Sequence, residues 1–393
     1  MFLTKGSTYP IGLDISDLSI KLVQLNKVRD KIKIQALSKI SLPREVITQG
    51  EIKNKPELIK AIKKILSAPA YGRVGSEEVV ACLPESKTFI KLIEVLKSPN
   101  TLADIMGGEI EKHVPLAASE IYYDWQIIED LTDRYYILIG AAPKEIVNQY
   151  TAMLDEAGLS PVALEIEPVA IARCLLKEES PAAKTVSFSA KPNAETGLNY
   201  GLLDIGADHT CMIFYSGNTI LFTVSMPISG REITSNISKT LGITFEQAER
   251  AKIICGLDET KADGVIREIL AGMMKDLVAK IKEALQYYEN YFNQRGPLNK
   301  ILLSGGGANI TNLIKIISQE MQIEVQIADS LTNLNEDQSK FNELFTEKHS
   351  LDFRRAKPGA GEAEKNLSIK QISSSAYATA VGLALRGIFI DEY

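Results

Sequence analysis

The sequence predicts an α/β protein of two duplicated lobes, with an inserted α/β subdomain in the first lobe. A unit of strand, acid-bearing turn, two further strands and a helix starts near residue 9 and again near residue 200, about 190 residues later. That interval is too long for a solenoid repeat. A mixed block of strands and helices at about 79–158 interrupts the first unit. We therefore expect a duplication with an insertion.

The composition is that of an ordinary soluble globular protein. The chain has 393 residues, of which 45% are hydrophobic and 24% are charged, values that exclude collagen, a coiled coil and wholesale disorder. Its net charge of −6 disfavours a general nucleic-acid binder, which usually presents a basic surface. No run reaches the roughly 20 apolar residues that span a bilayer. We expect a cytoplasmic protein that binds no nucleic acid and has no membrane span of its own.

The first lobe is expected to cover residues 9–178, with the inserted subdomain at about 79–158. Alternation of apolar and polar residues indicates the strands, and recurrence of apolar residues three and four apart indicates the helices. The expected strands are 9–13, 19–25, 31–37, 79–83, 88–92, 122–128, 135–141 and 161–166, and the expected helices are 58–66, 101–113 and 144–157.

The second lobe is expected to cover residues 200–393, after a flexible linker at 179–199 that is poor in large apolar residues. Its expected parts are strands at 200–203, 210–215 and 219–226, a helical subdomain at about 232–297, a mobile loop at about 334–370 and a final helix at 373–388 that packs back. Small residues in this last helix favour a close crossing with another helix.

Two acids, Asp14 and Asp204, each end an apolar strand and open a tight turn into a second strand. The turn amides of such hairpins point inward and can hold phosphate oxygens. Two strand-end carboxylates suit a hydrated Mg²⁺ ion held between them. The alternative is a pair of ordinary hairpins in which Asp is a turn former, and the residues alone leave both interpretations open.

Two further motifs carry chemistry. The apolar run 301–303 leads through Ser304 into Gly305, Gly306 and Gly307, and glycines let a backbone lie close against a flat ligand or a phosphate. No Gly-Lys-Ser/Thr follows, so this is not a P-loop. Glu167 precedes a Pro that suits the first position of a helix.

These elements, in this order, resemble the phosphate 1, connect 1, phosphate 2, adenosine and connect 2 motifs of the actin, heat-shock chaperone and sugar kinase superfamily. The resemblance spans residues 10–388 and implies an actin-like ATPase fold with two RNase H-like lobes. More narrowly, the chain resembles the PilM family, the actin-like proteins of type IV pilus assembly, and then the cell-division family FtsA. The supporting segments are 14–21, 204–207, 228–234, 248–252, and 114–116 leading into 123–125.

The resemblance implies ATP and Mg²⁺ as cofactors. Asp14 and Asp204 would order Mg²⁺ through water, Lys21 would reach the β- and γ-phosphates as a point charge, and Glu167 would position an attacking water. Glu249 and Lys252 share a helix face that would meet the ribose, with an ordinary solvated pair as the alternative. The full expected cofactor-binding set is Asp14, Ser16, Asp17, Ser19, Lys21, Asp204, Gly206, Ala207, Asp208, His209, Thr210, Glu249, Lys252, Gly305, Gly306 and Gly307.

Two residues depart from the superfamily pattern. Ser16 stands where Gly is usual, and its Cβ restricts the backbone. Asp17 stands where a small hydroxyl residue is usual, and its carboxylate repels a triphosphate unless Mg²⁺ compensates. We therefore expect nucleotide binding with at most weak hydrolysis.

The resemblance also implies partners. The PilM family binds the cytoplasmic N-terminal segment of the inner-membrane protein PilN in a groove between the first lobe and the inserted subdomain. Leu83, Pro84 and Ile90 are candidate wall positions, with ordinary core positions as the alternative. A pilus assembly ATPase is a further expected partner, and the protein would lie at the inner face of the cytoplasmic membrane. The alternative functions are an active ATPase or kinase, and an FtsA-like filament-forming division protein.

Overall fold

The computed structural model describes residues 8–177, 198–226, 228–336 and 374–389. The expected linker at 179–199 lies outside the described residues apart from its last two. The expected loop at 334–370 lies outside them beyond residue 336.

A six-stranded sheet forms the centre of the first lobe, in the order β11-β7-β1-β2-β3-β6. Strand β1 is antiparallel to β2 and parallel to β7. Helices α1 and α3 cover one face with an apolar cluster that includes Leu13, Leu58 and Met153. The bounds are β1 Ile11–Ser16, β2 Ser19–Val28, β3 Lys31–Ser41, β6 Tyr71–Gly72, β7 Glu78–Leu83, β11 Ser160–Ile166, α1 Lys55–Ser67 and α3 Lys144–Ala157, with the small β4 Ile47–Thr48 and β5 Glu51–Ile52 beside them.

The second lobe repeats this plan. Its strands belong to an eight-stranded sheet in the order β16-β15-β12-β13-β14-β8-β10-β9. Strand β12 is antiparallel to β13 and parallel to β15, as β1 is to β2 and β7. The bounds are β12 Tyr200–Ile205, β13 Thr210–Ser216, β14 Thr219–Met226, β15 Lys300–Ser304, β16 Glu324–Ile327, α5 Gly230–Leu241, α6 Phe245–Ile254, α7 Val265–Tyr291 and α8 Leu313–Met321.

The inserted subdomain contributes the other three strands of that sheet. They are β8 (Phe89–Leu96), β9 (Ile121–Asp130) and β10 (Arg134–Pro143), packed on α2 (Leu102–His113). The subdomain therefore begins at β8, because β7 and α3, at the ends of the expected 79–158 block, belong to the first lobe. One backbone pair, Lys91 with Phe222, joins β8 to β14 of the second lobe.

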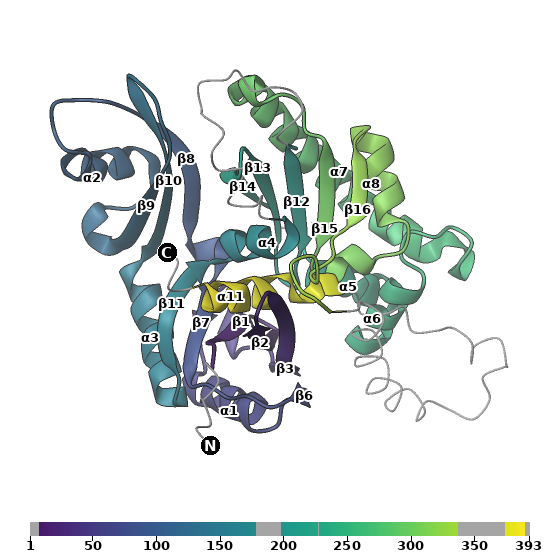
Figure 1. Cartoon of the computed structure of the whole chain (residues 1–393). Helices are drawn as coiled ribbons and strands as arrows, with labels where there is room; N and C mark the ends of the chain where they lie inside the picture. The colour runs from purple at the N-terminus through teal and green to yellow at the C-terminus, as the bar shows by residue number, and fades with distance from the viewer. Residues whose placement is uncertain (1–7, 178–197, 227, 337–373, 390–393) are drawn as a thin grey trace.

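Two helices, α4 (Glu167–Leu175) and α11 (Ala378–Ile388), cross at the centre of the molecule between the two sheets (Figure 1). A Cβ atom on Gly382 would lie 1.9 Å from the carbonyl oxygen of Ala170, and one on Gly12 would lie 2.3 Å from that of Ala380. Only glycine fits at both contacts, which confirms the close crossing expected from the small residues. None of the helices in the described ranges is both long and apolar enough to span a bilayer.

Candidate functional site

The strand-end acids of β1 and β12 lie near the start of α4, where they share charged neighbours. The charges of Glu167 and Lys21 bear on both Asp14 and Asp204. We call the cluster of Asp14, Lys21, Glu167, Asp204 and His209 the interlobe site. The structure thus brings together acids that the sequence places about 190 residues apart.

Asp14 is held by an ion pair. It is 2% exposed, and Lys21, directly opposite on β2, donates a 2.6 Å hydrogen bond to its Oδ2. Burial raises the pKa of Asp14, although Lys21 opposes the shift. Burial works against the charge of Lys21 as well, but Asp14 raises the pKa of the ammonium overall. An incoming phosphate would therefore compete with Asp14 for Lys21.

Asp204 is held by a neutral hydrogen bond. Ser304, at the end of the parallel strand β15, donates to Asp204 Oδ1 at 2.6 Å. Burial and the carboxylate of Glu167 raise the pKa of Asp204 to about 6. No cation faces it across the hairpin, where Cys211 lies opposite. A bound cation would therefore be stabilised more by Asp204 than by Asp14, whose charge is already paired with Lys21.

Glu167 begins α4 and is fixed by two elements of the chain. Thr379 of α11 donates to its Oε1 at 3.0 Å, and His209 Nε2 lies 3.7 Å from its Oε2. Burial acts against the charge of each, but the His209 interaction lowers the pKa of Glu167, and the carboxylates around His209 raise its pKa to about 9. A protonated His209, after β12 of the second lobe, therefore faces an ionised Glu167 at the start of α4.

Residues 16–19 use their side chains within the first lobe. Both carboxylate oxygens of Asp17 accept backbone N–H groups, from Gln49 at 2.7 Å and from Gly50 at 3.1 Å. The hydroxyl of Ser16 donates to the Ser19 carbonyl at 3.0 Å. The Asp17 carboxylate therefore stabilises the β4–β5 turn, a use that the sequence did not indicate.

The second hairpin is held largely by backbone hydrogen bonds. Gly206 donates to the His209 carbonyl at 2.9 Å, and a Cβ atom there would lie 2.9 Å from that oxygen. The amides of Gly230 and Arg231 in turn bond the carbonyls of Gly206 and Ala207. Thr210 donates its hydroxyl to Ile228, and Asp208 forms an ion pair with Arg231.

The glycine turn lies against the end of β12. Gly305 has φ +77°, and Cβ atoms on Gly305 and Gly307 would collide with Ile205, at 2.4 Å from its carbonyl oxygen and 2.2 Å from its Cγ2. A Cβ on Gly306 would meet nothing within 4 Å. Two of the three glycines are therefore required by packing, and Gly306 faces open space.

Of the expected ribose pair, Glu249 is the more exposed. The Lys252 ammonium donates to Glu249 Oε2 at 2.8 Å, to the Gly230 carbonyl at 3.0 Å and to the Thr234 hydroxyl at 2.9 Å. Its donors are used to fix α6 against α5. The Glu249 side chain is 41% exposed.

The donors of the interlobe site fit a hydrated Mg²⁺ ion. Carboxylates and water are the ligands that Mg²⁺ prefers, and Asp14, Glu167 and Asp204 supply three carboxylates. Within the described parts of the chain, however, no three His, Cys, Asp or Glu side chains lie close enough to chelate a metal directly. That Asp14 and Asp204 hold a Mg²⁺ ion through water stays a prediction.

One acid beside the interlobe site was missed by the sequence reasoning. Glu85 follows β7, is 7% exposed, and lies with its Oε2 3.7 Å from His209 Nε2. An acid just past an apolar strand is the same signal that singled out Asp14 and Asp204. Leu83 and Ile90, by contrast, are buried in apolar clusters. They are therefore core residues, the alternative that the sequence left open for these candidate wall positions of a peptide groove.

Comparisons with known proteins agree on one architecture. The chain is similar to a chain of the PilM-PilN type IV pilus biogenesis complex, at 21% identity and a TM-score of 0.73, covering 97% of this chain and 98% of that one. It is also similar to the ethanolamine utilization protein EutJ of Carboxydothermus hydrogenoformans, at 14% identity and a TM-score of 0.51, covering 96% and 90%. The predicted actin-like fold is thereby confirmed.

The curated relatives include cell division proteins FtsA. That of Bacillus subtilis is 19% identical over 360 residues, covering 81% of this chain and 78% of the relative. That of Enterococcus hirae is 21% identical over 362 residues, covering 81% and 77%. A family model described as type IV pilus assembly protein PilM matches residues 12–353. That match spans most of the chain, which therefore belongs to the PilM family of type IV pilus assembly proteins.

Proposed function

We propose that the chain binds Mg²⁺-ATP between its lobes and uses the bound state to control its hold on a PilN-like partner. The observation that carries the nucleotide part is the convergence of Asp14 and Asp204, from matching hairpins of two lobes, beside Lys21 and Glu167. Phosphate would meet the turn amides, and the base would lie over the open side of the glycine turn at Gly306.

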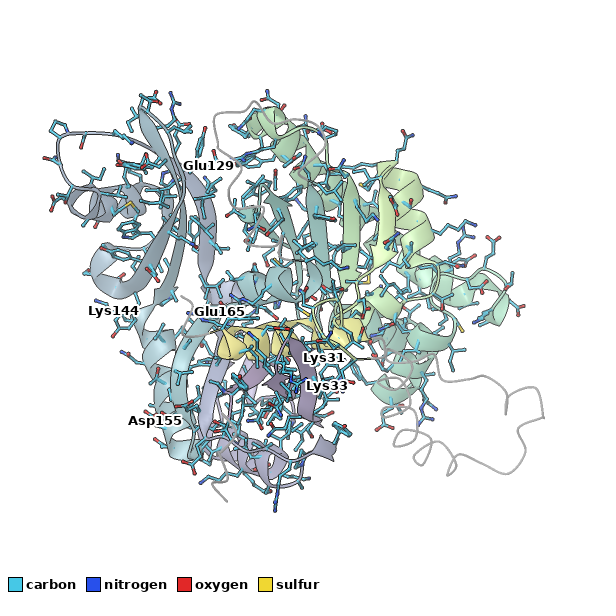
Figure 2. All side chains as sticks on the ribbon, viewed as in Figure 1. Lys31, Lys33, Glu129, Lys144, Asp155 and Glu165 are labelled. Atoms are coloured by element: carbon cyan, nitrogen blue, oxygen red, sulfur yellow. The ribbon has the colours of Figure 1, made fainter. Side chains whose placement is uncertain are left out.

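Titration calorimetry with Mg²⁺-ATP tests the nucleotide part. We expect the wild type to bind, and Asp204→Asn to weaken binding at least about ten-fold, because one of two carboxylates for Mg²⁺ is lost. Asp155→Asn is the matched control, since Asp155 is exposed on α3, away from the site (Figure 2). Failure of the wild type to bind would leave an actin-like scaffold without its ligand.

The partner part draws on the similar PilM-PilN complex. An extended peptide can add its backbone to an exposed strand edge, and β9 and β11 are the edge strands on either side of the boundary between the inserted subdomain and the first lobe. Exposed apolar residues lie on both strands, among them Tyr122 of β9 at 49% and Val162 of β11 at 39%. Tyr122 also contacts α3, through a 3.4 Å hydrogen bond to Asn148.

Fluorescence anisotropy with the labelled cytoplasmic N-terminal peptide of the PilN-like protein tests this part. We expect binding that depends on Mg²⁺-ATP and that Tyr122→Ala weakens about ten-fold. Tyr291→Ala removes the same type of side chain, 65% exposed, from α7 and is expected to leave the affinity unchanged. Equal affinity with and without nucleotide would remove the proposed coupling between the two sites. A protein tied to the membrane only through this peptide would localise at its cytoplasmic face.

A further inference from the structure

Lys39 of β3 is a charged residue near the interlobe site that none of the expected motifs includes. It lies directly opposite Lys21 on the neighbouring strand, and Lys21 in turn lies opposite Asp14. Paired residues on adjacent antiparallel strands project from the same face of a sheet. Asp14, Lys21 and Lys39 therefore form a row across β1, β2 and β3 on one face.

This row continues the face that packs on α11. Val23 and Leu37, the next cross-strand pair on this face of β2 and β3, are buried in the cluster that contains α11 residues such as Val381 and Leu385. At Lys21 and Lys39 the face changes from apolar to charged. The charge of Glu249, from α6 of the second lobe, acts on Lys39, as do those of Lys21 and Asp14. Lys39 therefore lies on the side of the first lobe that faces the second.

The ammonium of Lys39 differs from those of Lys21 and Lys252 in its hydrogen bonding. The ammonium of Lys21 bonds Asp14 and that of Lys252 has three acceptors, whereas Lys39 is exposed and makes no hydrogen bond or ion pair with the residues that the structure describes. Desolvation of its ammonium by the surrounding protein nevertheless lowers the pKa of Lys39 to about 8, and the charge of Lys21 adds to this effect. An exposed cation that has lost part of its hydration and has no counterion is suited to bind an anion.

We propose that Lys39 is a phosphate-binding residue of the nucleotide site, holding the polyphosphate chain beside Lys21. The proposal rests on the proposed nucleotide function and adds to it the residue that supplies the uncommitted positive charge. Phosphate would meet Lys39 without first displacing a carboxylate, whereas it must compete with Asp14 for Lys21. The two lysines together offset the repulsion by the three carboxylates of the site.

The experiment measures Mg²⁺-ATP affinity by calorimetry at low and at high salt for the wild type, Lys39→Met, Lys39→Arg and Lys33→Met. We expect Lys39→Met to weaken binding about ten-fold at low salt and to flatten its salt dependence, and Lys39→Arg to restore most of both. Lys33 is exposed on the same strand, six residues towards the β2–β3 turn (Figure 2). Removing its equal charge is expected to leave affinity unchanged, and thermal unfolding without ligand checks that each variant is folded.

Each outcome decides a separate point. Wild-type affinity in Lys39→Met, or a loss that Lys39→Arg fails to restore, would overturn the role of Lys39 while leaving nucleotide binding in place. A loss of the same size in Lys33→Met would show a general surface-charge effect and would equally overturn it. Absence of binding by the wild type would overturn the proposed nucleotide function, and this inference with it.

Discussion

The two hairpins occupy matching places in the two lobes, but they hold their acids differently. Asp14 faces Lys21 across its hairpin, with Cys82 of the parallel strand β7 3.8 Å away. Asp204 faces Cys211 and takes its hydrogen bond from Ser304 of the parallel strand β15. The main polar partner of the acid thus lies on the hairpin in the first lobe and on the parallel strand in the second. The first acid is neutralised within its own lobe, whereas the second keeps a charge for a ligand.

Breaking the first arrangement should have the largest effect on stability. Asp14→Ala strands the nearly buried ammonium of Lys21, so we expect the free energy of unfolding to fall by about 3–5 kcal/mol. Asp204→Asn keeps an oxygen that accepts from Ser304 and leaves no cation unpaired, so we expect the free energy of unfolding to change by about 1 kcal/mol or less. Urea unfolding at pH 7 measures both. Equal losses in the two variants would show that the hairpins do not differ in this way.

The residue three positions after the strand-end acid also differs between the two hairpins. Asp17 bonds two backbone amides of the first lobe, whereas the residue at the same place in the second hairpin is Ala207. We expect Asp17→Ala to lower the free energy of unfolding by about 2–3 kcal/mol, because both amides lose a charged acceptor. The same urea experiment measures it, with Asp155→Ala as the exposed control. Tighter ATP binding without loss of stability would show instead that the carboxylate acts on phosphate.

The acidity of Asp204 predicts a pH dependence. Its pKa is about 6 in the folded chain, because of burial and Glu167, against roughly 3.9 when unfolded. Between these values only the folded state holds the proton, so this group makes the free energy of unfolding fall by about 2 kcal/mol as pH rises from about 4 to 6. Urea unfolding across this range should show a shallower decline in Asp204→Asn. A profile identical to that of the wild type would contradict the assignment.

The smallest effect is expected at Ser16. It replaces the glycine found at the matching Gly206, and its hydroxyl bonds the Ser19 carbonyl. Ser16→Gly loses that bond and gains backbone freedom when unfolded, a cost of about 1 kcal/mol or less. We expect ATP affinity to stay within about two-fold. A large gain in affinity would mean that the Ser16 Cβ, rather than the Asp17 carboxylate, restricts the first hairpin.

The sequence predicted the parts of this site that depend on local order. Strand alternation and strand-end acids located both hairpins, and the glycines located the turn after β15. It could not predict how charges are paired, because the partners come from distant segments. Asp17 binds Gln49 and Gly50, Glu167 binds Thr379, and Lys252 binds Gly230. Lys39 was missed because one lysine in a strand with several others carries no local signal.

The single backbone pair between β8 and β14 has a mechanical consequence. The inserted subdomain belongs to the first lobe by chain connectivity, but Lys91 and Phe222 join it to the sheet of the second lobe, and an ion pair of Arg295 with Glu129 adds a side-chain link. Apolar side chains reinforce this junction, because Leu92 is buried in the core cluster of the second lobe and Ile128, Tyr136 and Leu138 pack against that cluster. A pulling force on a partner bound to the subdomain would therefore be transmitted through the junction to the sheet of the second lobe.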